Sequence, residues 1–277
     1  MLRVDLHMHS TCSDGTCSPA ELVRLLSHHR VSVASLTDHD TVEGVPAFLA
    51  ACRKKGIRGV AGVELSSSFG EDELHILGYR FDLKNPGLTM AMEHYRRARN
   101  RRNAAVCERL ISLGIPVTIE EVLLRAESSV PGRPHIAQVL LDKGWVASLH
   151  DAFTRYLGRG AAAYVPRELL SAAECIDLIR SAGGLPVWAH PLPSLSDRGA
   201  FGPVLDHLKD FGLWGVECWF RRSTPADTLI CLKEAGRRGL YATAGTDFHG
   251  RAGHSAGISG RLVEDNLLPW ARFCGGR

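Results

Sequence analysis

Short apolar runs alternate along most of the chain with longer segments in which apolar positions recur at helical spacing. The runs are rich in Val, Ile and Leu, which is typical of buried strands. Strands that alternate with helices indicate β/α units around a parallel sheet. We expect seven strands, at 2–7, 31–37, 57–64, 74–81, 185–190, 213–218 and 240–246.

Helix-period segments connect most of these strands. Ser18-Pro19-Ala20-Glu21 combines an N-cap residue, a first-turn proline and an early acid, so we expect a helix that runs to about His29. Further helices are expected from Thr41 or Glu43 to Lys55 and at 172–182, 201–211 and 225–238.

The alternation breaks once, between Pro86 and Pro166, where the pattern is helical throughout and includes a capping box at Thr118-Ile-Glu-Glu. A chain of 277 residues is long enough for one barrel-sized domain with an insert. We therefore expect a helical insertion beside the mouth of a barrel. The expected division is a first barrel part at 1–85, the insertion at 86–166 and a second barrel part at 167–277.

The composition is that of an ordinary globular protein. Hydrophobic residues make up 45% and charged residues 23%, which excludes disordered and fibrous classes. We expect a cytoplasmic protein, since the sequence has neither a membrane-spanning run nor the pattern of a secretory signal. Its eight cysteines form no C-x-x-C pair, so we expect reduced thiols. A net charge of +3 is too small to indicate nonspecific binding of polyanions.

Histidine and carboxylate residues follow the predicted strands. Asp5, His7 and His9 form D-x-H-x-H at the end of the first strand, where side chains two apart point the same way. The carboxyl ends of barrel strands are where such folds keep their chemistry. Each residue alone has an ordinary structural explanation, but their recurrence at strand ends favours a metal cluster. The later members are Asp38, His39, Asp40, Glu64, His75, His190, Asp247 and His249.

Five segments together resemble the PHP superfamily, named for polymerase and histidinol phosphatase. They are D-L-H-M-H-S-T-C-S-D-G at 5–15, L-T-D-H-D at 36–40, G-V-E at 62–64, A-H-P at 189–191 and T-D-F-H-G at 246–250. The resemblance covers the barrel part of the chain. It implies a distorted seven-stranded (β/α)7 barrel with two or three divalent metal ions at its C-terminal face.

The resemblance also implies which residues hold the ions. His7, His9, Glu64 and Asp247 would hold one ion, Glu64 would bridge to a second held by His75 and His190, and Asp14, His39 and His249 would hold a third. Ligands without cysteine suit Mn²⁺, Fe²⁺ or Zn²⁺, and the resemblance favours manganese or zinc. Asp5 and Asp38 are expected to orient imidazoles or to cap strand ends, and Asp38 is counted among the candidate catalytic residues.

The segment G-R-P-H-I-A at 132–137 resembles PHP proteins that act as 3′,5′-nucleoside bisphosphate phosphatases. In that interpretation Arg133 and His135 face the metals and bind phosphate, whereas a lone histidine at a helix start can also be a cap or a solvated residue. Arg99, Arg102 and Asn103 on the preceding helix are further candidates, with a solvated helix face as the alternative.

An aromatic and basic segment leaves the sixth predicted strand. Trp219 could stack on a base and Arg222 could bind a second phosphate, or the aromatic residue could belong to the core beside a solvated turn. Both are therefore candidate substrate-binding residues.

These observations favour a phosphatase that removes the 3′-phosphate of 3′,5′-bisphosphorylated nucleotides through a metal-bound hydroxide. Alternatives that use the same site are a 5′-to-3′ exonuclease on short 5′-phosphorylated RNA or DNA and a histidinol-phosphate phosphatase. A metal-stabilised interaction module without activity is the alternative from another class, and missing ligands would indicate it.

Overall fold

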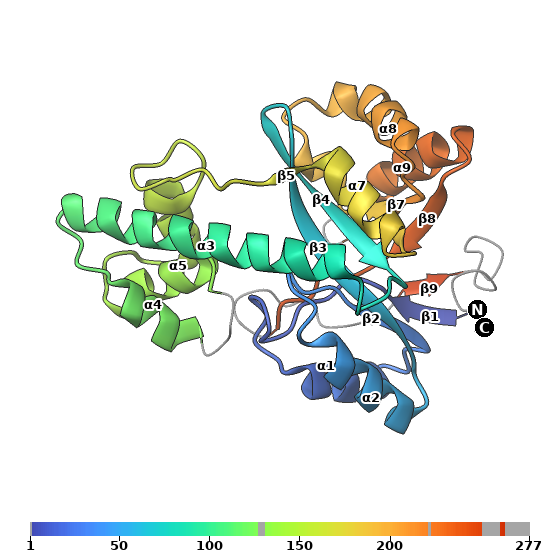
Figure 1. Cartoon of the computed structure of the whole chain (residues 1–277), viewed down its shortest axis with the longest axis horizontal. Helices are drawn as coiled ribbons and strands as arrows, with labels where there is room; N and C mark the ends of the chain where they lie inside the picture. Colours follow the sequence, from blue (N-terminus) through green and yellow to red (C-terminus); the bar gives the residue numbers. More distant parts are fainter. Residues whose placement is uncertain (1, 127–130, 221–222, 251–260, 264–277) are drawn as a thin grey trace.

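The computed structural model describes residues 2–126, 131–220, 223–250 and 261–263 of the chain. Seven strands confirm the sequence prediction and follow one another in the sheet in the order β8, β7, β6, β4, β3, β2, β1 (Figure 1). They curl into a nearly closed barrel, since Leu6 donates to Ala244 and Asp247 to His7 beyond the ends of β1 and β8. The strands are β1 (Leu2–Asp5), β2 (Val33–Leu36), β3 (Arg58–Phe69), β4 (Asp72–Tyr79), β6 (Leu185–Trp188), β7 (Gly215–Trp219) and β8 (Tyr241–Ala244).

The direction of β4 differs from the expected parallel sheet. β3 and β4 form an antiparallel hairpin, and β4 also pairs antiparallel with β6. The turn between β3 and β4 is too short for the crossover helix that parallel strands need. Two very short strands were not predicted, β5 (Leu170–Ser171) beside β3 and β9 (Arg261–Val263) beside β1, because so few residues carry no periodicity.

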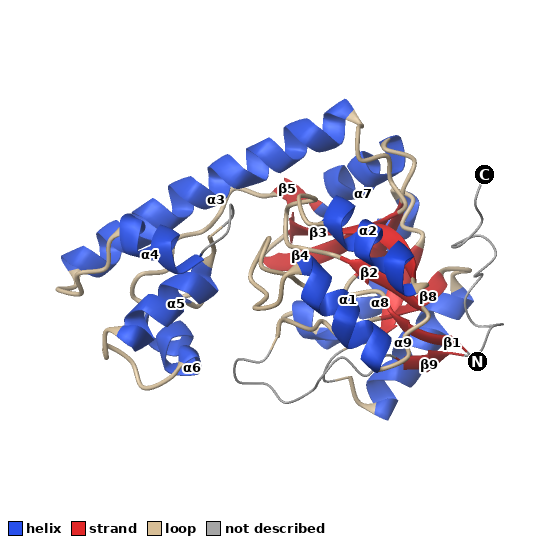
Figure 2. Cartoon of the chain, turned by 90° about the horizontal axis from the view of Figure 1, so that it is seen from below, coloured by secondary structure: helices blue, strands red, loops and turns tan. Residues whose placement is uncertain are grey.

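Helices cover the outside of the barrel, as the alternation predicts (Figure 2). Ser18 and Glu21 form the expected capping box at the start of α1, and Thr224 and Asp227 form another at the start of α9. The barrel helices are α1 (Pro19–His28), α2 (Val45–Lys55), α7 (Ala172–Ser181), α8 (Phe201–Asp210) and α9 (Pro225–Arg237), with short 3₁₀ turns at Leu192–Ser194 and Arg198–Ala200.

The helical segment between 86 and 166 lies to one side of the barrel (Figure 1) and has a hydrophobic core of its own. The long helix α3 contacts α7 of the barrel and α4 of the segment, so it joins the two parts. The separate core favours the predicted division at 86 and 166, which stays a prediction. The segment comprises α3 (Pro86–Ser112), α4 (Ile119–Ala126), α5 (Arg133–Asp142), α6 (Leu149–Ala152) and a π-helical turn, η1 (Phe153–Leu157).

Within the described residues, no helix combines the length and the apolar character that a membrane span requires. The seven described cysteines are free thiols, as expected from their spacing.

Candidate active site

The carboxylate of Glu64 lies at the centre of the predicted ligands. Glu64 is at the C-terminal mouth of the barrel and is fully buried. Three imidazole nitrogens approach its Oε2 within 3.0 to 3.2 Å, and two approach its Oε1 at 2.8 and 3.0 Å. They are Nε2 of His7, Nε2 of His9 and Nδ1 of His39 at Oε2, and Nδ1 of His75 and Nε2 of His190 at Oε1.

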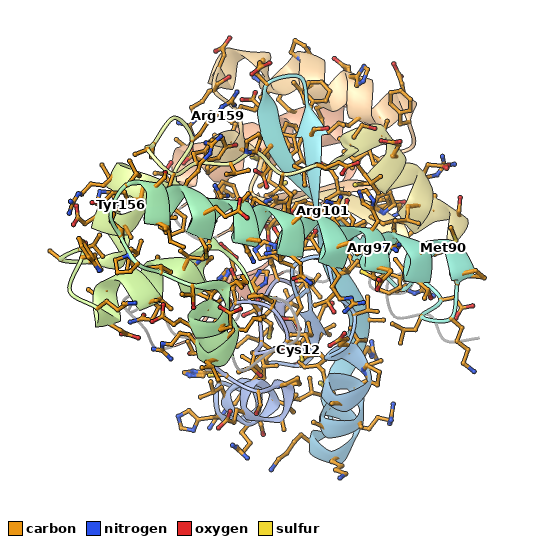
Figure 3. The ribbon with its side chains drawn as sticks, turned by 60° about the vertical axis from the view of Figure 1, so that its left-hand side comes forward. Cys12, Met90, Arg97, Arg101, Tyr156 and Arg159 are labelled. Carbon is orange, nitrogen blue, oxygen red and sulfur yellow. The ribbon has the colours of Figure 1, made fainter. Side chains whose placement is uncertain are left out.

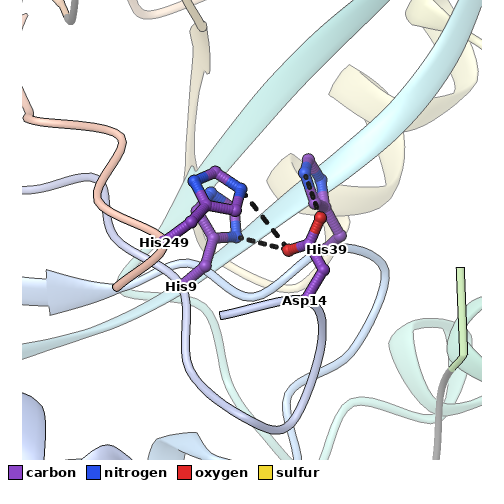
Figure 4. Close-up of side chains that lie close together, drawn as sticks. All are labelled: His9, Asp14, His39 and His249. Atoms are coloured by element: carbon purple, nitrogen blue, oxygen red, sulfur yellow. Dashed lines mark ion pairs between the residues drawn. The ribbon is translucent and has the colours of Figure 1, made fainter. Parts of the chain in front are cut away.

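Asp14 lies among a second group of imidazoles beside the first (Figure 4). Its Oδ1 lies 3.4 Å from His249 Nε2 and 3.9 Å from His9 Nδ1. Its Oδ2 lies 4.0 Å from His39 Nε2. His9 therefore stands between both groups, and its ring is stacked on that of His249 with the centroids 4.0 Å apart.

Asp247 completes the cluster from the loop after β8. Its Oδ1 lies 3.3 Å from His9 Nε2 and 3.6 Å from His7 Nε2. Asp247 and His190 both have positive φ, at 51° and 28°, although neither is glycine. Backbone strain of this kind concentrates at functional sites, where the surrounding structure holds it in place.

The cluster fits divalent cations. Buried polar atoms without a hydrogen-bond partner among the described residues are concentrated here, namely His7 Nε2, His9 Nδ1 and Nε2, His39 Nδ1 and Glu64 Oε2. Burial lowers the pKa of His9, yet Asp247, Glu64 and Asp14 outweigh it and raise this pKa to about 10. A field that stabilises an imidazolium ion equally attracts a metal ion. All nine predicted ligands fall into four overlapping groups, so their assignment to single ions stays a prediction.

Glu217 contacts the ring of one candidate ligand and the backbone of another. Its Oε1 is 3.0 Å from His7 Nδ1, and its Oε2 accepts a hydrogen bond from the backbone N–H of His190 at 2.8 Å. The side chain is fully buried at the end of β7. A carboxylate on the outer nitrogen leaves Nε2 of His7 available to an ion. A buried glutamate at a strand end was the signal that sequence reasoning missed.

Asp38 and Asp5 have hydrogen-bond partners other than imidazole nitrogens among the described residues, so their orienting role stays a prediction. Asp38 accepts hydrogen bonds from Ser10 N–H at 2.6 Å and from Ser13 Oγ at 2.7 Å. Asp5 accepts from Thr246 N–H at 2.9 Å and from its hydroxyl at 2.7 Å. Both carboxylates tie the loops that carry ligands to each other, which agrees with the alternative of a strand-end cap.

Two candidate arginines of α3 are buried, and only one of them has a partner among the described residues. Arg99 is hydrogen-bonded to Asp40 Oδ2, which Arg167 also approaches at 2.7 Å. Arg102 is only 7% exposed and has no hydrogen-bonded or ion-paired partner among the described residues. Burial, together with Arg133, Arg167 and Arg99, lowers the pKa of Arg102 to about 8. Its cation is thus poorly compensated by the protein and suits an anionic ligand.

The start of α5 adds the other candidates from the helical segment. His135 Nδ1 accepts a hydrogen bond from Gly132 N–H at 2.9 Å, so the residue caps its helix, as the alternative interpretation predicted. Asn103 holds the Pro131 carbonyl at 2.8 Å. The Arg133 guanidinium lies 5.9 Å from the centre of the Phe153 ring. Their expected contacts with substrate stay predictions.

The remaining arginines of α3 lie on its solvated face. Arg96, Arg97, Arg101 and Arg109 are exposed. Arg97 and Arg101 are labelled along α3 in Figure 3, and each is paired with a nearby glutamate.

Trp219 is half-buried at the end of β7 and lines a cavity of about 330 Å³ with Ser223 and Leu229. It also packs against the core, so base stacking stays a prediction. Arg222 lies outside the described residues.

Comparisons with known proteins agree with this site. The PHP domain family matches residues 5–113. A 5′-3′ exoribonuclease of Haemophilus influenzae is 32% identical over 98% of this chain and 99% of its own. A 3′,5′-nucleoside bisphosphate phosphatase of Chromobacterium violaceum is 30% identical over 93% of this chain and 91% of its own.

A solved structure from Bifidobacterium adolescentis, described as a candidate metal-dependent phosphoesterase, superposes with a TM-score of 0.88. It is 28% identical and covers 98% of this chain, while this chain covers 96% of that one. Both the barrel and the helical segment therefore have counterparts in known proteins. The chain belongs to the PHP domain family and is a metal-dependent phosphoester hydrolase.

Proposed function

We propose that this protein removes the 3′-phosphate from 3′,5′-bisphosphorylated nucleotides and leaves the nucleoside 5′-monophosphate. The observation that carries the proposal is a cluster of imidazoles and carboxylates with a poorly compensated arginine, Arg102, on the helical segment beside it. Such a pair of features suits one phosphoryl group that reacts and a second anionic group that is only bound.

The nine ligands would hold two or three divalent ions, for which manganese is our first choice and zinc or iron the alternatives. When bound, such ions activate water and stabilise negative charge on a phosphoryl oxygen. In the reaction a water molecule loses one proton as its oxygen bonds to phosphorus, the bond from phosphorus to the 3′-oxygen breaks, and the 3′-oxygen takes up one proton. Glu217 keeps His7 in the orientation that exposes its Nε2.

His135 is suited to contact the substrate as a neutral donor. Its Nδ1 accepts a hydrogen bond, so in the neutral ring the proton is on Nε2. Burial lowers the pKa of His135, which favours the neutral ring at pH 7. Nε2–H could then donate to a phosphoryl oxygen or to the leaving 3′-oxygen, while Arg133 and Arg102 bind the 5′-phosphate.

The experiment is phosphate release from adenosine 3′,5′-bisphosphate by protein supplied with Mn²⁺. Arg102→Met should raise KM at least tenfold, because it removes a charge-assisted contact worth about 1.5–3 kcal/mol. The matched control is Arg101→Met, since Arg101 is exposed on the same helix and pairs with Glu168. Absence of phosphate release by the wild-type protein would refute the proposal.

A second candidate is 5′-to-3′ exonuclease activity on short 5′-phosphorylated RNA. The names of three relatives from Haemophilus, Salmonella and Escherichia support it. An oligonucleotide presents at its 5′ end the same 5′-phosphate and 3′-phosphoester as the bisphosphate. Cleavage of 5′-phosphorylated but not of 5′-hydroxyl dinucleotides would indicate that one pocket serves both reactions.

A further inference from the structure

Glu73 lies between His75 of the metal cluster and Arg167. It precedes His75 by two residues on β4, so the two side chains are on the same face of the strand. Glu73 Oε1 is 3.8 Å from His75 Nε2 and 3.7 Å from Arg167 Nη2. The other nitrogen of the same ring, His75 Nδ1, is 2.8 Å from Glu64 Oε1. One imidazole therefore has the central carboxylate on one side and Glu73 on the other.

Arg167 holds this arrangement from the linker that returns to the barrel. Its side chain is only 4% exposed, and its Nη1 donates to Asp40 Oδ2 at 2.7 Å. Asp40 follows His39 with a positive φ of 56° and accepts a hydrogen bond from Ser66 N–H at 2.8 Å. The same guanidinium thus contacts the loop that carries one candidate ligand and the glutamate beside another.

Arg99 of the helical segment contacts the same Asp40 carboxylate as Arg167. The contacts therefore run from Asp40 through Arg167 to Glu73 and to the ring of His75.

We propose that Glu73 and Arg167 are positioning residues that hold the imidazole of His75 in its orientation. The proposal rests on the proposed function, because it takes His75 as a metal ligand. An ion-binding histidine usually donates its outer N–H to a carboxylate, which fixes the tautomer and strengthens the ligand. Glu73 is the carboxylate on the outer nitrogen of His75, at ion-pair distance, and Arg167 contacts its Oε1.

The test compares Glu73→Gln with Glu71→Gln by competition for Mn²⁺ against a chelating dye. Glu71 is in the same hairpin but pairs with Arg159 at the exposed tip (Figure 3), so its loss should leave metal affinity unchanged. Glu73→Gln should weaken the affinity of one ion about 10- to 100-fold, the usual effect of removing such a partner. Equal affinities of the two variants would overturn the proposal.

Arg167 is tested by rescue and by a double variant. Arg167→Met should weaken metal affinity, and Arg167→Lys should recover part of it, because a point charge replaces a two-pronged donor. The double variant Glu73→Gln/Arg167→Met should lose less metal affinity than the product of the two separate fold losses, since both residues act on one ring. Fully independent effects would contradict a shared role.

His75→Ala separates this inference from the proposed function. If His75→Ala keeps the full number of ions, His75 is not a ligand and the metal assignment itself fails. If His75→Ala loses an ion while Glu73→Gln binds like wild type, only the positioning role is refuted. Thermal unfolding of each variant in the presence of a chelator verifies that it is folded.

Discussion

At the scale of single residues, the site is built from buried charges that compensate one another. Glu217 orients His7, and Asp40 receives two guanidinium groups from outside the first barrel part. A buried carboxylate is stable only when such partners replace the water it has lost. These contacts determine how much stability the protein loses when one partner is removed.

Asp40 gives a prediction for stability against pH. Burial alone would raise its pKa, but Arg167 and Arg99 outweigh it, so the folded value lies below the unfolded value of about 3.9. The stabilisation is therefore complete above pH ~4 and is lost as pH falls through the folded value. Asp40→Asn should cost about 3–5 kcal/mol at pH 7, because two buried guanidinium groups lose their counter-charge.

Urea unfolding at pH 7 and at pH 3 measures this effect. The difference in unfolding free energy between wild type and Asp40→Asn should be smaller at pH 3 than at pH 7. The control, Asp142→Asn, removes an exposed pair with Arg125 and should change stability by less than about 1 kcal/mol. If the difference in unfolding free energy were the same at both pH values, the charge of Asp40 would not stabilise the protein.

The convergence of the candidate ligands was predictable from sequence, whereas the residues that contact them mostly were not. Histidines and acids at strand ends can be recognised in the sequence, because metal chemistry requires those residue types at the carboxyl ends of the strands. Glu73 had a usable signal, its i, i+2 spacing to His75 on one strand. Arg167 had none, because its contact with Asp40 bridges 127 positions and depends on how the helical segment folds back.

At the scale of elements, the strands were easier to predict than their directions. Apolar runs locate β4, but pairing depends on the connection, and a tight turn made β3 and β4 a hairpin. The hairpin matters for function because it places Glu64 and His75 on adjacent strands, with Glu64 Oε1 2.8 Å from His75 Nδ1. A regular parallel unit would have placed a crossover helix between the two strands along the sequence.

The close approach of β8 to β1 gives a second prediction. A Cβ at Gly245 would lie 2.1 Å from His7 Cβ and 2.7 Å from Glu217 Oε1. Gly245→Ala should therefore destabilise the protein by at least about 1–3 kcal/mol and displace His7. Gly236→Ala is the control, because its Cβ would meet nothing within 4 Å and alanine favours the helix by about 0.5–1 kcal/mol.

Unfolding midpoints and bound Mn²⁺ are the measurements. Gly245→Ala should lower both, and Gly236→Ala should lower neither. Normal metal content in Gly245→Ala would mean that β8 can move away from His7 without harm to the site.

At the scale of the whole molecule, the helical segment has a hydrophobic core that is separate from the core of the barrel. All nine candidate ligands lie outside 86–166, whereas Arg102, Arg133 and His135 lie within it. Metal binding should therefore depend on the barrel core, and substrate binding on the core of the helical segment. Neither core could be inferred from single motifs, because each joins residues from several elements.

Leu140 tests this division, since it is fully buried on α5, the helix that begins at Arg133. Leu140→Ala should cost about 2–5 kcal/mol of packing in the helical segment and raise KM while metal content stays normal. Leu77→Ala, in the barrel core, should reduce metal content as well, and Leu124→Ala is the control because that side chain is 80% exposed. If Leu140→Ala released the metal as readily as Leu77→Ala, the two cores would unfold together, and the helical segment would be part of the metal site's support rather than a separate platform for the substrate.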